Sequence, residues 1–157
     1  MATWQYTMKM FPRQGVIKHY GKEPDTVNQS ELEDANIWNG TNIIEDLKLE
    51  LEKCLPPVKS WSSDIDQFGS LEESCIEIFY ESGNISEISI RLDLRHLEKD
   101  QLEFLLACSS KFDLVIYDHE NGGRINSMNS FGSRIRSSSA YSFVKDPLKF
   151  LDALKTN

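Results

Sequence analysis

The sequence predicts an α+β fold: a largely antiparallel sheet with helices packed on one of its faces. Residues 3–10 and 88–95 alternate apolar and polar side chains, a period of two that is typical of strands with one buried face. A Gly-Asn pair just before the second stretch predicts a hairpin turn. Residues 42–55 and 96–112 instead space their apolar side chains three and four apart, which predicts helices. With 157 residues, we expect a single domain over 1–157.

The first forty residues combine one clear strand with weaker patterns. Pro12 ends the first strand, because proline cannot donate to a strand ladder. Residues 16–20 are expected to continue the sheet. Residues 21–40 are polar and rich in turn formers, which predicts a long loop that carries one short element.

The first predicted helix has recognisable ends. Asn42 is placed to cap its first turn, and Glu45 follows three residues later, as in a capping box. Pro56 and Pro57 stop the helix. Residues 75–80 follow as a strand, which we expect to pair through the glycine turn with the alternating strand after it.

The second half of the chain supplies the core and a last helix. The core residues of the alternating strand are expected to be Ile88, Ile90, Leu92 and Leu94. The unbroken apolar run 114–117 predicts a buried strand. Residues 127–145 carry no decisive pattern. Asp146 and Pro147 are typical of a helix start. The docking residues of that helix are expected to be Leu148, Leu151 and Leu154.

Composition argues against two classes of partner. The formal net charge of −8 repels phosphate backbones, so we expect no nucleic-acid binding. No apolar run reaches the roughly 18 residues that cross a bilayer, and the N-terminal residues do not read as a signal peptide. We therefore expect no membrane association and a cytoplasmic location. The three cysteines, Cys54, Cys75 and Cys108, are odd in number and far apart, which indicates buried free thiols.

The charge is unevenly distributed along the chain. Residues 1–120 hold 23 acidic and 11 basic side chains, a net charge of −12. Residues 121–157 hold 2 acidic and 6 basic side chains, a net charge of +4.

The sequence contains no recognisable cofactor motif. The three histidines lie outside any metal-binding pattern, and neither a P-loop nor a dinucleotide-binding glycine motif occurs. We therefore predict no cofactor, no metal and no catalytic residues. Two alternatives stay open. One is an acid–base pair or ligand set at residues 118–120, and the other is an anion site at 137–139 beside Arg134 and Arg136.

The strongest interaction candidate is the stretch 61–82, which holds six carboxylates and no lysine or arginine. Aromatic side chains within a charged rim are typical of binding hot spots. The predicted protein-binding residues are Trp61, Asp64, Asp66, Phe68, Glu72 and Glu73. A second candidate is the polar row of the alternating strand, whose guanidinium groups suit a partner's carboxylates. Its residues are Arg91, Asp93 and Arg95. The alternative there is a solvated face with cross-strand ion pairs.

A resemblance to a known group rests on four segments: the strand GNISEISIRLDLR, the helix after it, the strand LVIYD and the ending SSAYSFVKDPLKFL. These segments, over roughly 64–154, resemble small bacterial immunity proteins encoded beside polymorphic toxins. The resemblance implies a non-catalytic module that neutralises a cognate toxin by direct binding, and it implies no particular site residues. An acidic immunity protein suits a basic toxin. Two alternatives remain: a small cytoplasmic enzyme with a site assembled from dispersed residues, and a regulatory scaffold module.

Overall fold

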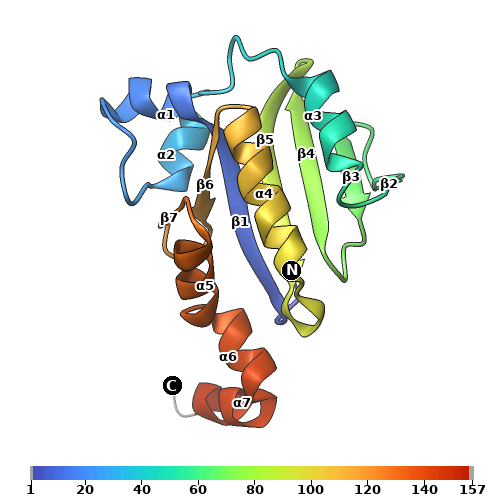
Figure 1. The fold of residues 1–157 in the computed structure, drawn as a ribbon, viewed down its shortest axis with the longest axis vertical. Coiled ribbons are helices and arrows are strands. Elements are labelled where there is room, and N and C mark those ends of the chain that lie inside the picture. The colour runs from blue at the N-terminus through green and yellow to red at the C-terminus, as the bar shows by residue number, and fades with distance from the viewer. Residues whose placement is uncertain (1, 156–157) are drawn as a thin grey trace.

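The structure, a computed structural model, describes residues 2–155 and contains one antiparallel sheet of seven strands (Figure 1). The strand order is β2-β3-β4-β5-β1-β6-β7. The strands are β1 (Gln5–Pro12), β2 (Pro57–Val58), β3 (Ile65–Gly69), β4 (Cys75–Glu81), β5 (Asn84–Asp93), β6 (Leu114–Asp118) and β7 (Arg124–Ile125). The helices are α1 (Arg13–Tyr20), α2 (Gln29–Asp34), α3 (Ile44–Leu51), α4 (Lys99–Lys111), α5 (Met128–Arg136), α6 (Ser139–Lys145) and α7 (Pro147–Lys155), with a 3-10 turn η1 (Leu94–His96). This arrangement confirms the predicted α+β fold.

The main core lies between the sheet and the helices α3, α4 and α5. In the centre of the sheet, Met8 of β1 stands opposite Ile90 of β5, and both are almost fully buried. The four apolar residues predicted on the alternating strand are all buried, the least so being Leu94 with 9% of its surface exposed. Period-two alternation therefore identified the core face of β5 correctly.

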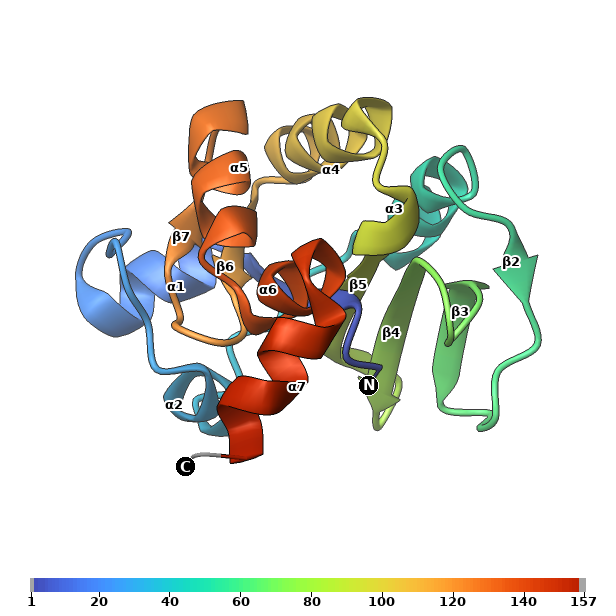
Figure 2. The same cartoon turned by 90° about the horizontal axis from the view of Figure 1, so that it is seen from below.

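The helices α1 and α2 lie on the opposite face of the sheet (Figure 2), so helices pack on both faces and not on one as predicted. A second, smaller core lies there. Phe11 of β1 and Tyr117 of β6 point there and pack with Val16 of α1 and Leu32 of α2. Because β6 is covered on both faces, its apolar run is unbroken rather than alternating.

The β4–β5 hairpin turns at Ser82 and Gly83, whose φ angles are +53° and +81°. Two successive residues with positive φ are typical of the type I′ turns that match strand twist. The turn thus lies one residue earlier than predicted, because Asn84 already pairs with Glu81 as the first residue of β5.

The prediction that residues 16–20 continue the sheet is wrong, because they belong to helix α1. Gly21 closes this helix in a left-handed conformation, φ +78°, and its N–H donates to the Ile17 carbonyl at 2.7 Å. Val16 is fully buried in the second core. The spacing of Val16 and Tyr20 fits a helix as well as a short strand. Gly21 favours the helix, because glycine is typical of the residue that ends one.

The long polar segment 21–40 contains the one short element expected, helix α2, which is capped by the side chain of Asn28. The predicted cap of the next helix is wrong. The N-cap of α3 is Ile43, which offers no side-chain acceptor, and Asn42 lies one residue before it. Glu45 and Asp46 lie in the first turn, where carboxylates interact favourably with the helix dipole without a capping bond.

The C-terminal helices begin at serine and aspartate caps. Ser127 and Ser130 form a reciprocal capping box at α5, where the sequence pattern was undecided. The predicted start of α7 is confirmed, since the Lys149 N–H donates to Asp146 Oδ1 at 3.0 Å. None of the helices in residues 2–155 is both long and apolar enough to cross a membrane.

The predicted docking of α7 through its leucines is wrong. Leu148 and Leu151 are 76% and 46% exposed, and the side chain of Leu154 lies outside the described part. The reason is that α7 packs chiefly against α6 and not against the sheet (Figure 1).

The expectation of free thiols is confirmed. Burial raises the pKa of Cys75 to about 11 and that of Cys108 to about 12, whereas Cys54 is only half-buried. The buried thiols are therefore protonated and weakly nucleophilic at neutral pH.

Candidate functional site

An open groove of about 850 Å³ lies at the β2–β3 side of the molecule. Three segments line it: the link from α3 through β2 to β3 (55–61), the end of β3 with the turn to β4 (67–74), and the chain from the end of β5 into α4 (93–101). We call this feature the groove. Its volume exceeds that of three other cavities in the described residues, of about 350, 470 and 630 Å³, and concave sites of this size commonly bind ligands or partner side chains.

Three exposed apolar side chains line the groove. Val58, Trp61 and Leu71 are 43%, 70% and 37% exposed. Single exposed apolar residues are ordinary, whereas a cluster of them on one concave surface is typical of interaction sites. Leu55 and Pro56 extend the same apolar lining.

Trp61 is held in place by a buried ion pair. Its Nε1 donates to Glu77 Oε2 at 3.3 Å, and Arg91 contacts the other carboxylate oxygen at 3.1 Å. Glu77 points away from the main core, on the sheet face opposite its neighbours Ile76 and Ile78, and yet it is only 2% exposed. Trp61 and Arg91 both contact its carboxylate there. This bond favours one orientation of the exposed indole, and a side chain that is already oriented loses less entropy when it is contacted.

The β3–β4 turn is fixed from both ends. At Gly69 the φ angle is +82°, and a Cβ there would lie 2.3 Å from the Ser74 carbonyl oxygen, so the close approach requires glycine. Gln5 of β1 donates from Nε2 to the carbonyl oxygens of Leu71 and Glu73, at 2.8 and 2.6 Å. These bonds hold Leu71 and Glu73 at the groove.

The predicted row of Arg91, Asp93 and Arg95 is occupied by intramolecular bonds. Asp93 is 2% exposed and accepts from the Arg95 backbone N–H and Nε, both at 2.9 Å, and from its Nη2 at 2.8 Å. The Arg95 guanidinium also holds the pKa of Asp93 below its usual value. Arg95 lies over the Trp4 ring, 4.1 Å from its centroid. With Arg91 bound to Glu77, the geometry agrees with the alternative of internal ion pairs.

Several carboxylates near the groove form no ion pair with a described residue, although Arg95 lies close enough to Glu72 and Glu73 to interact with their charge. The exposed acidic residues that form no ion pair with any described residue there are Asp64, Glu72, Glu73 and Glu98. Glu73 and Glu98 line the groove, together with one lysine, Lys59. The rim is therefore net negative.

The structure divides the predicted acidic stretch between two faces of the sheet. Trp61 and Glu73 line the groove, whereas Asp66 lies on the helix side, where it accepts from Tyr80 Oη at 2.6 Å and pairs with Lys48 at 3.2 Å. The prediction of Phe68 as a binding anchor is wrong, because Phe68 is 2% exposed within the main core. Asp66 and Phe68 are two residues apart on β3 and so share the face that the helices cover.

Sequence reasoning missed the apolar members of the groove, Val58 and Leu71. The prolines before Val58 served only as a helix stop, although they also favour an edge strand. Leu71 stands alone among polar residues and carries no periodic signal.

Residues 118–120 are bound within the molecule. Asp118 is buried and accepts from Tyr6 Oη and from the Asn121 N–H, and burial together with the Asp118 bond raises the pKa of Tyr6. His119 contacts Gln29, while the Glu120 carboxylate accepts from the backbone N–H and hydroxyl of Ser139 at the start of α6. The described residues contain no group of three His, Cys, Asp or Glu side chains placed to hold a metal ion.

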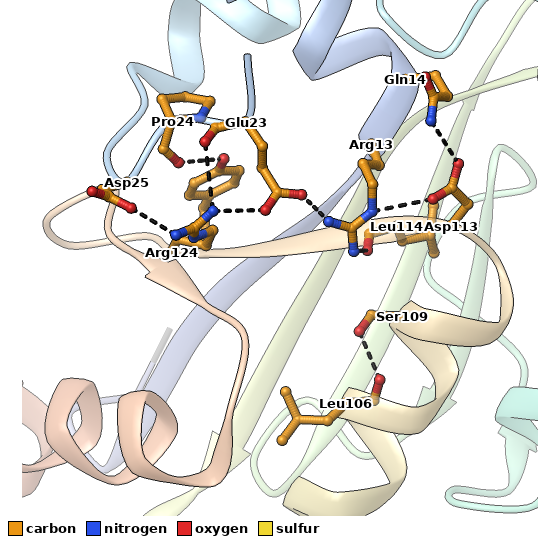
Figure 3. A network of polar contacts seen from close by, with 11 residues as sticks. Arg13, Gln14, Glu23, Pro24, Asp25, Leu106, Ser109, Asp113, Leu114 and Arg124 are labelled. Atoms are coloured by element: carbon orange, nitrogen blue, oxygen red, sulfur yellow. Dashed lines mark hydrogen bonds and ion pairs between the residues drawn. The ribbon is translucent and has the colours of Figure 1, made fainter.

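A second polar network, shown in Figure 3, joins the 21–28 loop to the sheet. Glu23 lies between Arg13 and Arg124, and Arg124 also pairs with Asp25 at 2.7 Å. Arg13 reaches Asp113 at 3.1 Å. Every charged group in this network has an opposite partner, so the network fastens the loop and leaves no free group for a ligand.

Comparisons with protein-family models, curated proteins and solved structures give no match for this chain.

Proposed function

We propose that the chain is a non-catalytic protein-binding module that binds its partner in the groove. The observation that carries this proposal is the cluster of Val58, Trp61 and Leu71 beside carboxylates that form no ion pair with a described residue. An apolar anchor within a polar rim is the usual anatomy of a protein interface. The complementary partner presents a basic surface with one or two protruding apolar side chains.

The edge of the sheet favours side-chain contacts over strand addition. β2 is the outer strand on this side, and Pro56 and Pro57 have no N–H to donate to an added strand. A partner strand would therefore find few backbone donors, and the affinity must come from the groove.

Within this class we propose an immunity protein that neutralises a cognate bacterial toxin by direct binding, as the sequence resemblance implies. The support is the fit between the acidic rim and a basic partner, which opposite fields bring together faster. An enzyme would most naturally use the cavity of about 350 Å³ lined by Tyr6, His119, Glu120 and Ser139. There Tyr6 and Ser139 already donate to carboxylates, which disfavours them as reacting groups.

The test is co-expression with the product of the neighbouring gene, followed by purification of the complex and a growth-rescue assay. We expect the wild-type chain to bind and to restore growth. Trp61→Ala combined with Leu71→Ala should weaken binding about thirtyfold or more, mainly through faster dissociation. Leu49→Ala is the matched control, because Leu49 is 62% exposed on α3 and does not line the groove.

Two results would count against this function. A neighbour that is neither toxic nor bound contradicts the immunity role. Full binding by the Trp61→Ala/Leu71→Ala variant, with its melting temperature unchanged, contradicts the groove as the binding surface.

A further inference from the structure

Helix α7 leaves two leucines uncovered. Leu148 and Leu151 are three residues apart, so they share one side of the helix. Among the described side chains, seven large apolar residues are exposed; two of them are on α7 and three are Val58, Trp61 and Leu71 of the groove. Exposed apolar surface concentrated in two places indicates two contact surfaces.

The surroundings of these two surfaces carry opposite charge. Residues 128–155 hold five basic and two acidic residues, the acidic ones being Asp146 and Asp152, so this region is net positive. The cations that form no ion pair with any residue in the described part are Arg134, Arg136, Lys145 and Lys149. At the groove, the carboxylates of Glu73 and Glu98 line the rim and form no ion pair with a described residue, and those of Asp64 and Glu72 follow in the adjacent segments. The lining also contains one lysine, Lys59. The same division appears in the whole sequence, with −12 over residues 1–120 and +4 over 121–157.

From this complementarity we infer that α7 of a second copy of this chain occupies the groove when no other partner is bound. An amphipathic helix binds a groove by laying residues i and i+3 into it, which fits Leu148 and Leu151. The flanking Lys145 and Lys149 then face the carboxylate rim. If each of two copies places its α7 in the groove of the other, both leucine surfaces and both grooves are covered. The assembly then closes as a two-fold dimer.

The self-association predicts a dimer that weakens with salt. Between about 0.1 and 1 M salt the Debye length falls from about 10 to about 3 Å, so the charged rim loses much of its attraction. Sedimentation equilibrium over a range of protein concentrations measures the dissociation constant. A wild-type chain that stays monomeric at every concentration would overturn the inference.

Two variants separate the contacting surfaces. We call α7 the arm, and the arm variant carries Leu148→Asp and Leu151→Asp. The groove variant carries Trp61→Ala and Leu71→Asp. All four side chains are exposed, so we expect both variants to fold, with melting temperature as the check. Each should raise the dimer dissociation constant about tenfold or more. Leu49→Asp, exposed but on neither surface, should leave it unchanged.

Mixing the two variants tests the pairing of arm with groove directly. At a concentration where only the wild type forms dimers, each variant alone should be monomeric. A mixture of the two still contains an intact α7 and an intact groove on different chains. We therefore expect a heterodimer, weaker than the wild-type dimer. If the arms paired with each other, or the grooves with each other, mixing would restore nothing and the inference would be wrong.

The inference does not depend on the proposed function, since the measurements use the chain alone. A variant that loses self-association but still binds the toxin, or one that self-associates but no longer binds it, separates the two proposals. The failure of self-association can then be told from the failure of the proposed function.

Discussion

Gly69 shows how one residue determines the shape of the groove. Its positive φ and the 2.3 Å approach to the Ser74 carbonyl leave no room for a side chain. Gly40 has a similar φ of +80°, but nothing lies within 4 Å of a Cβ placed there. The two positions therefore separate the cost of backbone conformation from the cost of the close contact.

We expect Gly40→Ala to lower the free energy of unfolding by about 1 kcal/mol, the cost of a left-handed alanine. Gly69→Ala should cost about 2 kcal/mol more, because the Ser74 carbonyl must also move. Urea denaturation measures both. Equal losses would mean that the β3–β4 turn yields freely and does not hold Leu71 in place.

Asp93 gives a pH-dependent test of the β5–η1 junction. Its pKa is lowered in the folded protein by the hydrogen bonds from Arg95, so its ionised form stabilises the fold above the unfolded pKa of about 3.9. That contribution is lost as the pH falls through the folded pKa. We expect Asp93→Asn to cost about 2 kcal/mol at pH 7 and progressively less below pH of about 4.

The measurement is urea denaturation across this pH range. Asp64→Asn is the control, because Asp64 is exposed and forms no ion pair with a described residue. A deficit of the Asp93→Asn variant that stays constant down to pH of about 3 would contradict the role of Arg95.

Among the elements, the buried face of strand β5 was predicted correctly and the packing of helix α7 was not, for a physical reason. The alternation of β5 arises because the sheet has one apolar face, and Ile90 is accordingly 1% exposed. The leucine spacing of α7 predicts an apolar stripe along the helix, but it does not specify what the stripe packs against. In the structure α7 packs chiefly against α6 and not against the sheet. The groove was predicted only at Trp61, Glu73 and Asp93. Gln67 and Leu71 lie within the predicted stretch but carry no pattern that marks them, and the start of α4 joins the groove only through the fold.

Ile90→Asp tests the assignment of the core face. It places a carboxylate without a partner in the main core, at a cost of several kcal/mol. We expect the variant to be unfolded or to melt far below the wild type by circular dichroism, whereas Leu49→Asp melts normally. Normal melting of the Ile90→Asp variant would refute the buried face of β5.

At the scale of the whole molecule, the groove has two competing occupants, α7 of a second copy and the proposed partner. Only the free groove binds the partner, so the apparent dissociation constant rises as the free fraction falls. At concentrations where the wild type is dimeric, we expect the Leu148→Asp/Leu151→Asp variant to bind the partner more tightly than the wild type. Titration at two concentrations of the chain measures this. Identical affinities at both would show that the two occupants do not compete.

The two prolines at the β2 edge also affect how readily the protein aggregates in a concentrated solution. A chain that keeps a tryptophan exposed beside a sheet edge is at risk of stacking edge to edge into fibrils. Pro56 and Pro57 lack the backbone N–H donors that such stacking needs. The apolar groove can therefore stay exposed, because further strands cannot add readily to the sheet edge beside it. Restoring those donors would turn the proposed binding surface into a nucleus for aggregation.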